Sequence, residues 1–164
     1  MKITLKDGSA KEYESATTAA EITKDISMGL YRNACCCRIN GAVKDLSTVV
    51  DSDCEYEVLT IDEEDGKKAL NHTTTHVMAQ AVKRLYPDAK LTIGPAIENG
   101  FYYDFDVETP FGPEDLEKIE KEMKKIIKEY YPIEKFELPV DEAIKLMQDK
   151  GEPYKIELIN EHAG

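Results

Sequence analysis

The predicted fold rests on residues 34–44, ACCCRINGAVK. Residues 34–39 have the length of a strand, and Asn40-Gly41 is the dipeptide most typical of a two-residue β-hairpin turn. Residues 42–44 are then expected to pair back on that strand. The sequence therefore predicts a β-hairpin in the first part of the chain.

The flanking sequence adds further short strands and one helix to this hairpin. Each is bounded by residues that favour turns or helix caps. They are a strand containing Ile3 and Leu5, a returning strand at residues 11–14, a helix capped by Thr17 or Thr18, and a strand at residues 54–59. We therefore predict an α+β protein whose first domain, residues 1–62, is a small ubiquitin-like β-grasp fold.

The second predicted domain, residues 63–164, begins with a long helix. The helix is expected over residues 67–85 and to stop before Pro87. The elements expected after it are strands at residues 90–97 and 100–106 joined by an Asn-Gly turn, a helix from Pro113 to about Tyr130, a strand at residues 133–138 and a helix at residues 141–149. Residues 153–159 fit a helix or a strand equally well.

Composition excludes several classes of protein. The chain has 164 residues, with 21 Lys and Arg against 33 Asp and Glu, which gives a net charge of −12. A general nucleic-acid coat protein would be basic, although a local basic patch remains open. No apolar run approaches the roughly 20 residues of a membrane span, and the N-terminus lacks the apolar stretch of a secretory signal. We expect a cytoplasmic protein without a membrane partner.

The cysteines do not form a metal-binding motif. Cys35, Cys36 and Cys37 are adjacent, and neighbouring residues of a strand point to opposite faces of the sheet. With Cys54 they are expected to be reduced thiols that fill small apolar spaces.

His72 and His76 are the main candidates for chemistry. They are four residues apart on the predicted long helix, so both imidazoles lie on one face, about one turn apart. They lie away from the centre of the apolar stripe, next to small residues such as Ala69 and Ala79. This placement suits the floor of a cleft.

Three interpretations of the pair remain open at this point. The histidines are a solvated surface pair, half of a zinc site, or part of a hydrolytic cleft in which neutral imidazoles orient water. The zinc protease motif is not present, because Thr73 stands where that motif has Glu. Zinc also needs three or four protein ligands, and no cysteine is an obvious partner. We therefore predict no metal ligands.

A basic stripe is predicted on the helix that follows Pro113. Its lysines fall within about 120° of one another around the helix. They are Lys118, Lys121, Lys124, Lys125 and Lys128. The stripe is either an ordinary solvated face, with Glu117 and Glu120 placed for helical ion pairs, or a local contact for the phosphates of a nucleic acid.

Several motifs resemble those of the bacterial-type threonyl-tRNA synthetase family. The resemblance is carried by Asn71-His72-Thr73-Thr74-Thr75-His76, Leu85-Tyr86-Pro87, the segment IGPAIENGFYYD at residues 93–104, and Gly151-Glu152-Pro153-Tyr154-Lys155. In that family the histidine pair and the downstream block belong to an editing domain. The preceding β-grasp part resembles the TGS domain, which unrelated proteins also carry.

The resemblance implies a function for the parent enzyme and roles for particular residues. The parent would ligate threonine to its tRNA using ATP, and this region would contribute to hydrolysis of mischarged seryl-tRNA. His72 and His76 would orient the tRNA end and water, Lys155 would supply positive charge, and Tyr103 would line the pocket.

The sequence also departs from the family pattern. The family completes its editing site with a Cys-x-x-x-His motif, which does not follow Lys155 here. The aminoacylation core, with its ATP, Mg and zinc, also lies outside this sequence. We therefore expect part of a longer enzyme that is inactive or weakly active alone, and monomeric, since the family dimerises through that core. The alternatives are a free-standing TGS-containing RNA-binding or regulatory module and a two-histidine metal-binding protein.

Overall fold

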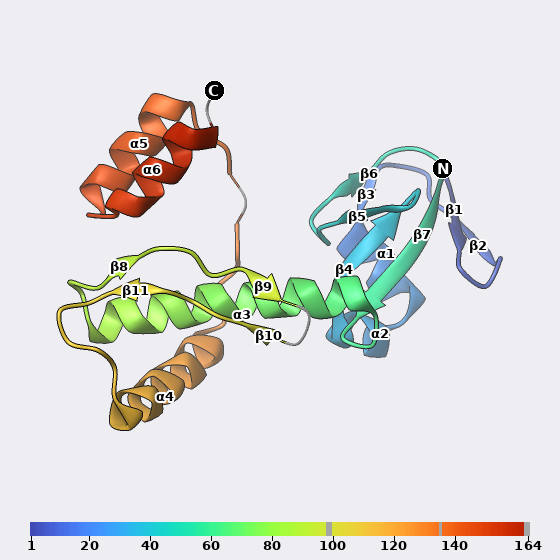
Figure 1. The fold of residues 1–164 in the computed structure, drawn as a ribbon. Coiled ribbons are helices and arrows are strands. Elements are labelled where there is room, and N and C mark those ends of the chain that lie inside the picture. Colours follow the sequence, from blue (N-terminus) through green and yellow to red (C-terminus); the bar gives the residue numbers. More distant parts are fainter. Residues whose placement is uncertain (98–99, 135, 163–164) are drawn as a thin grey trace. The chain divides into compact units, whose positions relative to one another are not determined.

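The computed structural model describes residues 1–97, 100–134 and 136–162. The chain folds into two compact units, Met1–Asn71 and His72–Gly164 (Figure 1). Each unit is considered by itself below.

The first unit is built on a mixed five-stranded sheet. Its strand order is β2-β1-β7-β4-β5, in which β1 and β7 are parallel and the other neighbours are antiparallel. The strands are β1 Lys2–Leu5, β2 Ala10–Glu12, β4 Ala34–Ile39, β5 Ala42–Lys44 and β7 Cys54–Thr60. The remaining elements are the pair β3 Thr17–Thr18 and β6 Val49–Val50, and the helices α1 Ala19–Ile26 and α2 Met28–Asn33. This arrangement confirms the predicted α+β class and the β-grasp fold.

The predicted Asn-Gly hairpin joins β4 and β5. Asn40 and Gly41 have φ angles of 48° and 83°, which are the positive values that a type I′ turn needs. The side chain of Asn40 also accepts a hydrogen bond of 2.9 Å from the amide of Glu55. The turn is therefore fixed both by its backbone geometry and by a contact with β7.

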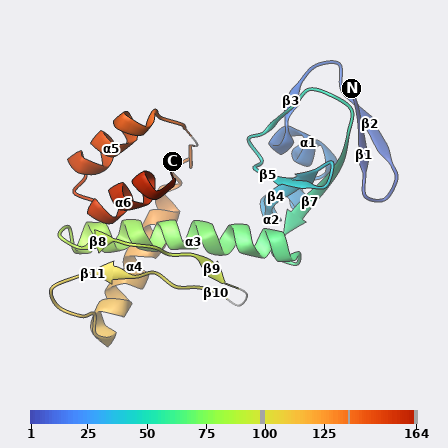
Figure 2. The same cartoon turned by 45° about the horizontal axis from the view of Figure 1, so that its top comes forward.

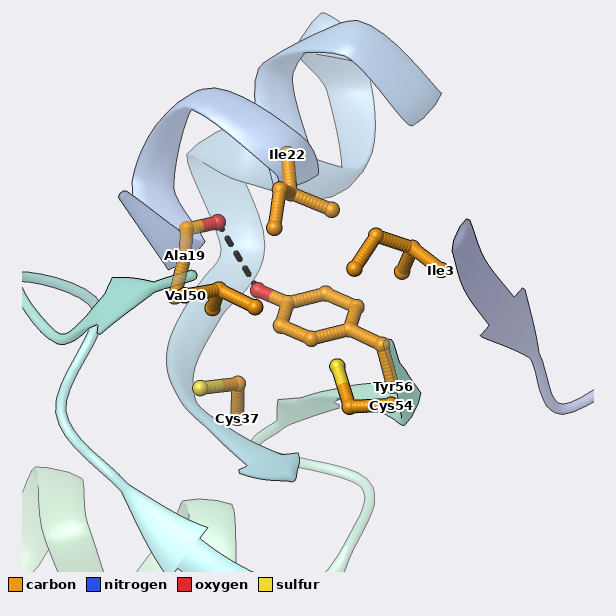
Figure 3. Packing of buried hydrophobic residues seen from close by; sticks show 7 residues of the cluster. All are labelled: Ile3, Ala19, Ile22, Cys37, Val50, Cys54 and Tyr56. Carbon is orange, nitrogen blue, oxygen red and sulfur yellow. Dashed lines mark hydrogen bonds between the residues drawn. The ribbon is translucent and has the colours of Figure 1, made fainter. Parts of the chain in front are cut away.

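Tyr56 lies at the centre of the first unit's core. Its ring is 2% exposed and lies among apolar side chains from the sheet and from α1 (Figure 3). Its hydroxyl donates to the carbonyl of Ala19 at 2.8 Å and lies 2.7 Å from the hydroxyl of Thr23. Cys37 and Cys54 pack beside it and Cys36 is also buried, so three of the four cysteines are core fillers as predicted, whereas Cys35 is only half-buried.

The second unit is arranged around helix α3, Glu64–Leu85, whose first turns belong to the first unit. The helix begins at Glu64, three residues before the predicted start. The other elements are β8 Lys90–Leu91, β9 Ala96–Ile97, β10 Gly100–Phe101, β11 Phe105–Asp106, α4 Pro113–Glu129, α5 Val140–Asp149 and α6 Pro153–His162. In both views the short strands run along α3, whereas α4 is inclined to it and crosses its direction in Figure 2 (Figures 1 and 2).

Two strand predictions in this unit need correction. The strands expected at residues 90–97 and 100–106 form the predicted antiparallel hairpin, but each is broken into two short strands that pair as β9–β10 and β8–β11. The first two turn residues, 98 and 99, lie outside the described residues. The strand expected at residues 133–138 is wrong for the described residues of that segment, which are exposed and have no neighbouring strand to pair with.

The core of the second unit lies between α3 and α4. Ala81, Val82, Ile119 and Ile126 are buried there. The apolar face expected on α4 is only partly covered, because Leu116 and Ile127 are each 60% exposed and Tyr130 is 91% exposed. Among the described residues, no helix combines the length and the apolar character that crossing a membrane requires.

Candidate functional site

His72 and His76 lie on one face of α3 and contact each other. Their Nε2 atoms are 3.1 Å apart, and their rings meet edge to face with centroids 4.6 Å apart. Both side chains are exposed to solvent. The distance is that of a hydrogen bond, in which the Nε2–H of one ring donates to the unprotonated Nε2 of the other.

The environment of His76 favours its neutral form. Partial burial lowers the pKa of the His76 imidazole below its ordinary value, and the charges of His72 and Lys155 lower it further. A neutral imidazole at neutral pH can accept a proton or orient a water molecule.

Tyr103 lies between β10 and β11 and packs tightly against its neighbours. Its ring stacks on Phe105 with centroids 4.7 Å apart and planes at 19°. Its other neighbour is Gly94, where a Cβ atom would lie 2.1 Å from Cδ2 of the tyrosine. Glycine at this position is therefore needed for the ring to occupy its place. Burial, and to a smaller extent the charge of Glu152, raise the pKa of Tyr103.

Lys155 joins helix α6 to this group. Its Nζ donates to the carbonyl oxygen of Thr92 at 2.7 Å and lies 5.9 Å from the ring centroid of Tyr103. Burial lowers the pKa of Lys155, and the carboxylate of Glu152 opposes that shift. The positive charge of Lys155 is also one of the causes that lower the pKa of His76.

The four residues predicted for the site lie on three parts of the unit and form two contacting pairs, His72 with His76 and Tyr103 with Lys155. His72 and His76 lie on α3, Tyr103 on the hairpin, and Lys155 on α6. The arrangement offers a proton acceptor, a positive charge and an aromatic wall.

A groove of about 350 Å³ borders His76. It runs between α3 and the end of α4, and its lining is mainly apolar, with Ile127, Tyr130 and Tyr131 among its residues. His76 therefore lies at the edge of an open depression.

Most lysines of the predicted stripe on α4 form ion pairs within that helix. Acidic residues of the same helix pair with most of them: Lys118 with Asp115 at 3.2 Å, Lys121 with Glu117 at 4.0 Å, Lys124 with Glu120 at 2.5 Å and Lys125 with Glu122 at 2.8 Å. These pairs reduce the positive potential of the predicted stripe, which also includes Lys128.

The fit of a metal ion can be judged from side-chain positions. Within the described ranges, no three His, Cys, Asp or Glu side chains gather closely enough to hold one. The histidine pair supplies two nitrogens, which is fewer than the three or four protein ligands that zinc prefers.

The contacts that hold α6 in place are not evident from the amino-acid sequence. Glu152 is 4% exposed, and its carboxylate binds Lys83 at 3.0 Å and the amide of Leu91 at 2.9 Å. Glutamate side chains are normally expected at the surface of a protein, so the neighbouring sequence does not predict that Glu152 is buried.

Known proteins match both the first part of the chain and nearly its whole length. Residues 1–60 match the family model described as the TGS domain. The chain is 62% identical over 161 residues to a threonine–tRNA ligase of Acetivibrio thermocellus, a match that covers 98% of this chain and 25% of that protein. Threonine–tRNA ligases of Clostridium tetani and Clostridioides difficile are 56% and 52% identical over the same share of each chain.

The chain is homologous to the N-terminal region of threonine–tRNA ligases. The match includes the second unit as well as the TGS domain, and the chain spans about a quarter of the length of the curated relatives it matches. The homology confirms the family resemblance carried by the histidine pair and the motifs downstream of it.

Proposed function

We propose that this chain is the TGS domain and the first part of the editing domain of a threonine–tRNA ligase, with the division at residues 1–62 and 63–164. The parent enzyme ligates threonine to tRNA with ATP. The second domain contributes to hydrolysis of seryl-tRNA formed in error. The proposal is supported by the homology, by the contact between His72 and His76, by the approach of Lys155 to the ring of Tyr103, and by the open groove that borders His76.

A separate hydrolytic site is useful because an amino-acid binding site can distinguish serine from threonine only to a limited extent. Serine and threonine differ by one methyl group, and a binding site discriminates against the smaller of two such substrates by only about 1–3 kcal/mol. Some serine is then attached to the tRNA, and a second site that cleaves the product restores accuracy.

The reaction at this site is the hydrolysis of an ester. Water adds to the carbonyl carbon of the seryl ester, the bond between that carbon and the ribose oxygen breaks, and a proton passes to the ribose oxygen. A neutral imidazole of the His72–His76 pair orients the water and carries the proton. The ammonium group of Lys155 stabilises the negative charge that develops on the carbonyl oxygen, and Tyr103 holds Lys155 and lines the pocket.

The remaining requirements of the parent enzyme lie outside this chain. ATP, Mg and zinc would be bound by its aminoacylation core, through which the enzyme would form a homodimer. A Cys-x-x-x-His motif would complete the editing site. We place the enzyme in the cytoplasm with tRNA as its partner.

The stripe of Lys118, Lys121, Lys125 and Lys128 is proposed as a secondary tRNA contact. Its contribution is expected to be small, because three of these lysines already have acidic neighbours on α4. A free-standing regulatory module is disfavoured because the similarity to the ligases continues through the second unit.

The function can be tested in a chimera in which this chain replaces the matching segment of the A. thermocellus ligase. We expect the chimera to deacylate seryl-tRNA, and His76→Ala to slow that reaction on the order of 100-fold or more, the effect typical of losing a general base. His162→Ala is the matched control, since His162 is exposed at the end of α6. Unchanged deacylation in the His76 variant would remove His76 from the mechanism.

A further inference from the structure

Glu152 and Lys83 form a buried connection between α6 and α3. Glu152 lies near the start of α6, just before its first residue, and its side chain is 5% exposed, against 28% for Lys83. The Nζ atom of Lys83 lies 3.0 Å from Oε1 of Glu152 and also donates to the carbonyls of Pro87 at 2.8 Å and Ala89 at 2.9 Å. The three protons of the ammonium group thus have three acceptors.

The second oxygen of Glu152 holds the strand next to the site. Oε2 accepts the amide proton of Leu91 in β8 at 2.9 Å. Both carboxylate oxygens are therefore occupied, as the burial of a charged group requires.

Lys155 lies one helical turn after Glu152 and binds the adjacent residue of the same segment. Its Nζ donates to the carbonyl of Thr92, while Glu152 binds the amide of Leu91. The amide of Lys155 also donates to the carbonyl of Glu152 at 3.2 Å. Displacement of Glu152 would therefore displace the base of the Lys155 side chain as well.

We propose that Glu152 is a positioning residue of the candidate site, and that with Lys83 and the amide of Leu91 it fixes the start of α6 so that the Lys155 ammonium group lies against the carbonyl of Thr92 and the ring of Tyr103. A role for this arrangement in ester hydrolysis rests on the proposed function; the positioning itself does not. The charged or titratable groups that face Lys155 are Glu152 on its own segment, Tyr103 on the hairpin and His76 on α3.

The positioning can be measured without any catalytic assay. In the 164-residue chain, Glu152→Gln keeps the side chain's size but removes the charge that supports the Lys155 ammonium, so the pKa of Lys155 should fall. The measurement is a carbon-detected NMR titration of the lysine Cε signals, with the Lys155 signal assigned from its loss in Lys155→Arg. Glu129→Gln is the matched control, since it breaks an ion pair with Arg84 on another face and should leave the Lys155 pKa unchanged.

The chimera then separates positioning from function. Glu152→Gln should reduce kcat for seryl-tRNA deacylation on the order of 10- to 100-fold with little change in KM, as a small misplacement of a reacting group does. If the unmutated chimera does not deacylate, the proposed function fails, and the positioning is then judged by whether Glu152→Asp, which keeps the charge, also moves the Lys155 pKa. If the chimera is active and Glu152→Gln changes neither the Lys155 pKa nor kcat, the positioning proposal is overturned.

A second variant covers the case in which Glu152→Gln does not fold. Glu152→Asp keeps the charge but is one methylene shorter, so it cannot reach Lys83 and Leu91 together. We expect kcat to fall in this variant while the chain remains folded. A kcat equal to that of the unmutated chimera would overturn the proposal.

Discussion

At the scale of single residues, His76 combines exposure to solvent with a depressed pKa. Partial burial lowers its pKa most, and the charges of His72 and Lys155 lower it further. The folded protein therefore resists protonation of His76. This property, more than the spacing of the two histidines, suits His76 to chemistry near neutral pH.

The consequence is a pH dependence with a defined sign. Because the folded pKa lies below the ordinary value of 6.5, the unfolded chain binds more protons than the folded chain as the pH falls below that value. His76 should therefore reduce the free energy of unfolding progressively in that range. An imidazole NMR titration of the 164-residue chain should give a His76 pKa below that of the same histidine in the urea-unfolded chain; an equal or higher value would contradict the structure.

At the scale of elements, the start of α3 is fitted closely to the first unit's sheet. Gly66 faces the end of β7, where a Cβ atom would lie 1.9 Å from the carbonyl oxygen of Thr60. Asp65 binds the guanidinium of Arg38 at 2.8 Å, and the Glu63 carboxylate accepts the amide of Thr60 at 2.7 Å. Only a residue without a side chain lets the helix approach this closely.

Gly66→Ala is therefore expected to destabilise the first unit by about 1–3 kcal/mol, the range typical of overpacking a closely fitted site. The measurement is urea denaturation followed through the amide NMR signals of residues 1–60. Gly29→Ala is the control, because it is also a helical glycine but its Cβ would meet only the Ser27 hydroxyl, at 3.5 Å. Equal stability of the two variants would show that the close approach does not exist in solution.

The elements also show what local sequence can predict. The Asn40-Gly41 hairpin and the helix capped by Thr18 were predictable because turn and cap residues act within a few positions of themselves. Helix α2 was missed because its six residues are too few to show a helical period. The strand expected at residues 133–138 failed because alternation cannot reveal whether a partner strand exists.

The same distinction applies to the candidate site. His72 and His76 were predictable as a pair because one helical turn separates them. Tyr103 and Lys155 were named from family motifs, whereas the buried link between Lys83 and Glu152 depends on how distant segments fold together. Local patterns do not contain that information.

At the scale of the second unit, the account depends on three separate elements forming one site. Helix α3 supplies the imidazoles, the hairpin supplies Tyr103, and α6 supplies Lys155. None of these elements holds the whole arrangement by itself. Residues that act as one catalytic unit have strongly non-additive effects when removed together.

A double-mutant cycle on His76 and Lys155 tests this claim most directly. The measured quantity is the rate constant for deacylation of seryl-tRNA by the chimera and by its His76→Ala, Lys155→Ala and double variants. We predict that the double variant is about as slow as the slower single variant, because either loss disables the shared site. Rate losses that multiply in the double variant would mean that the two residues act independently, and the single-site account would then be wrong.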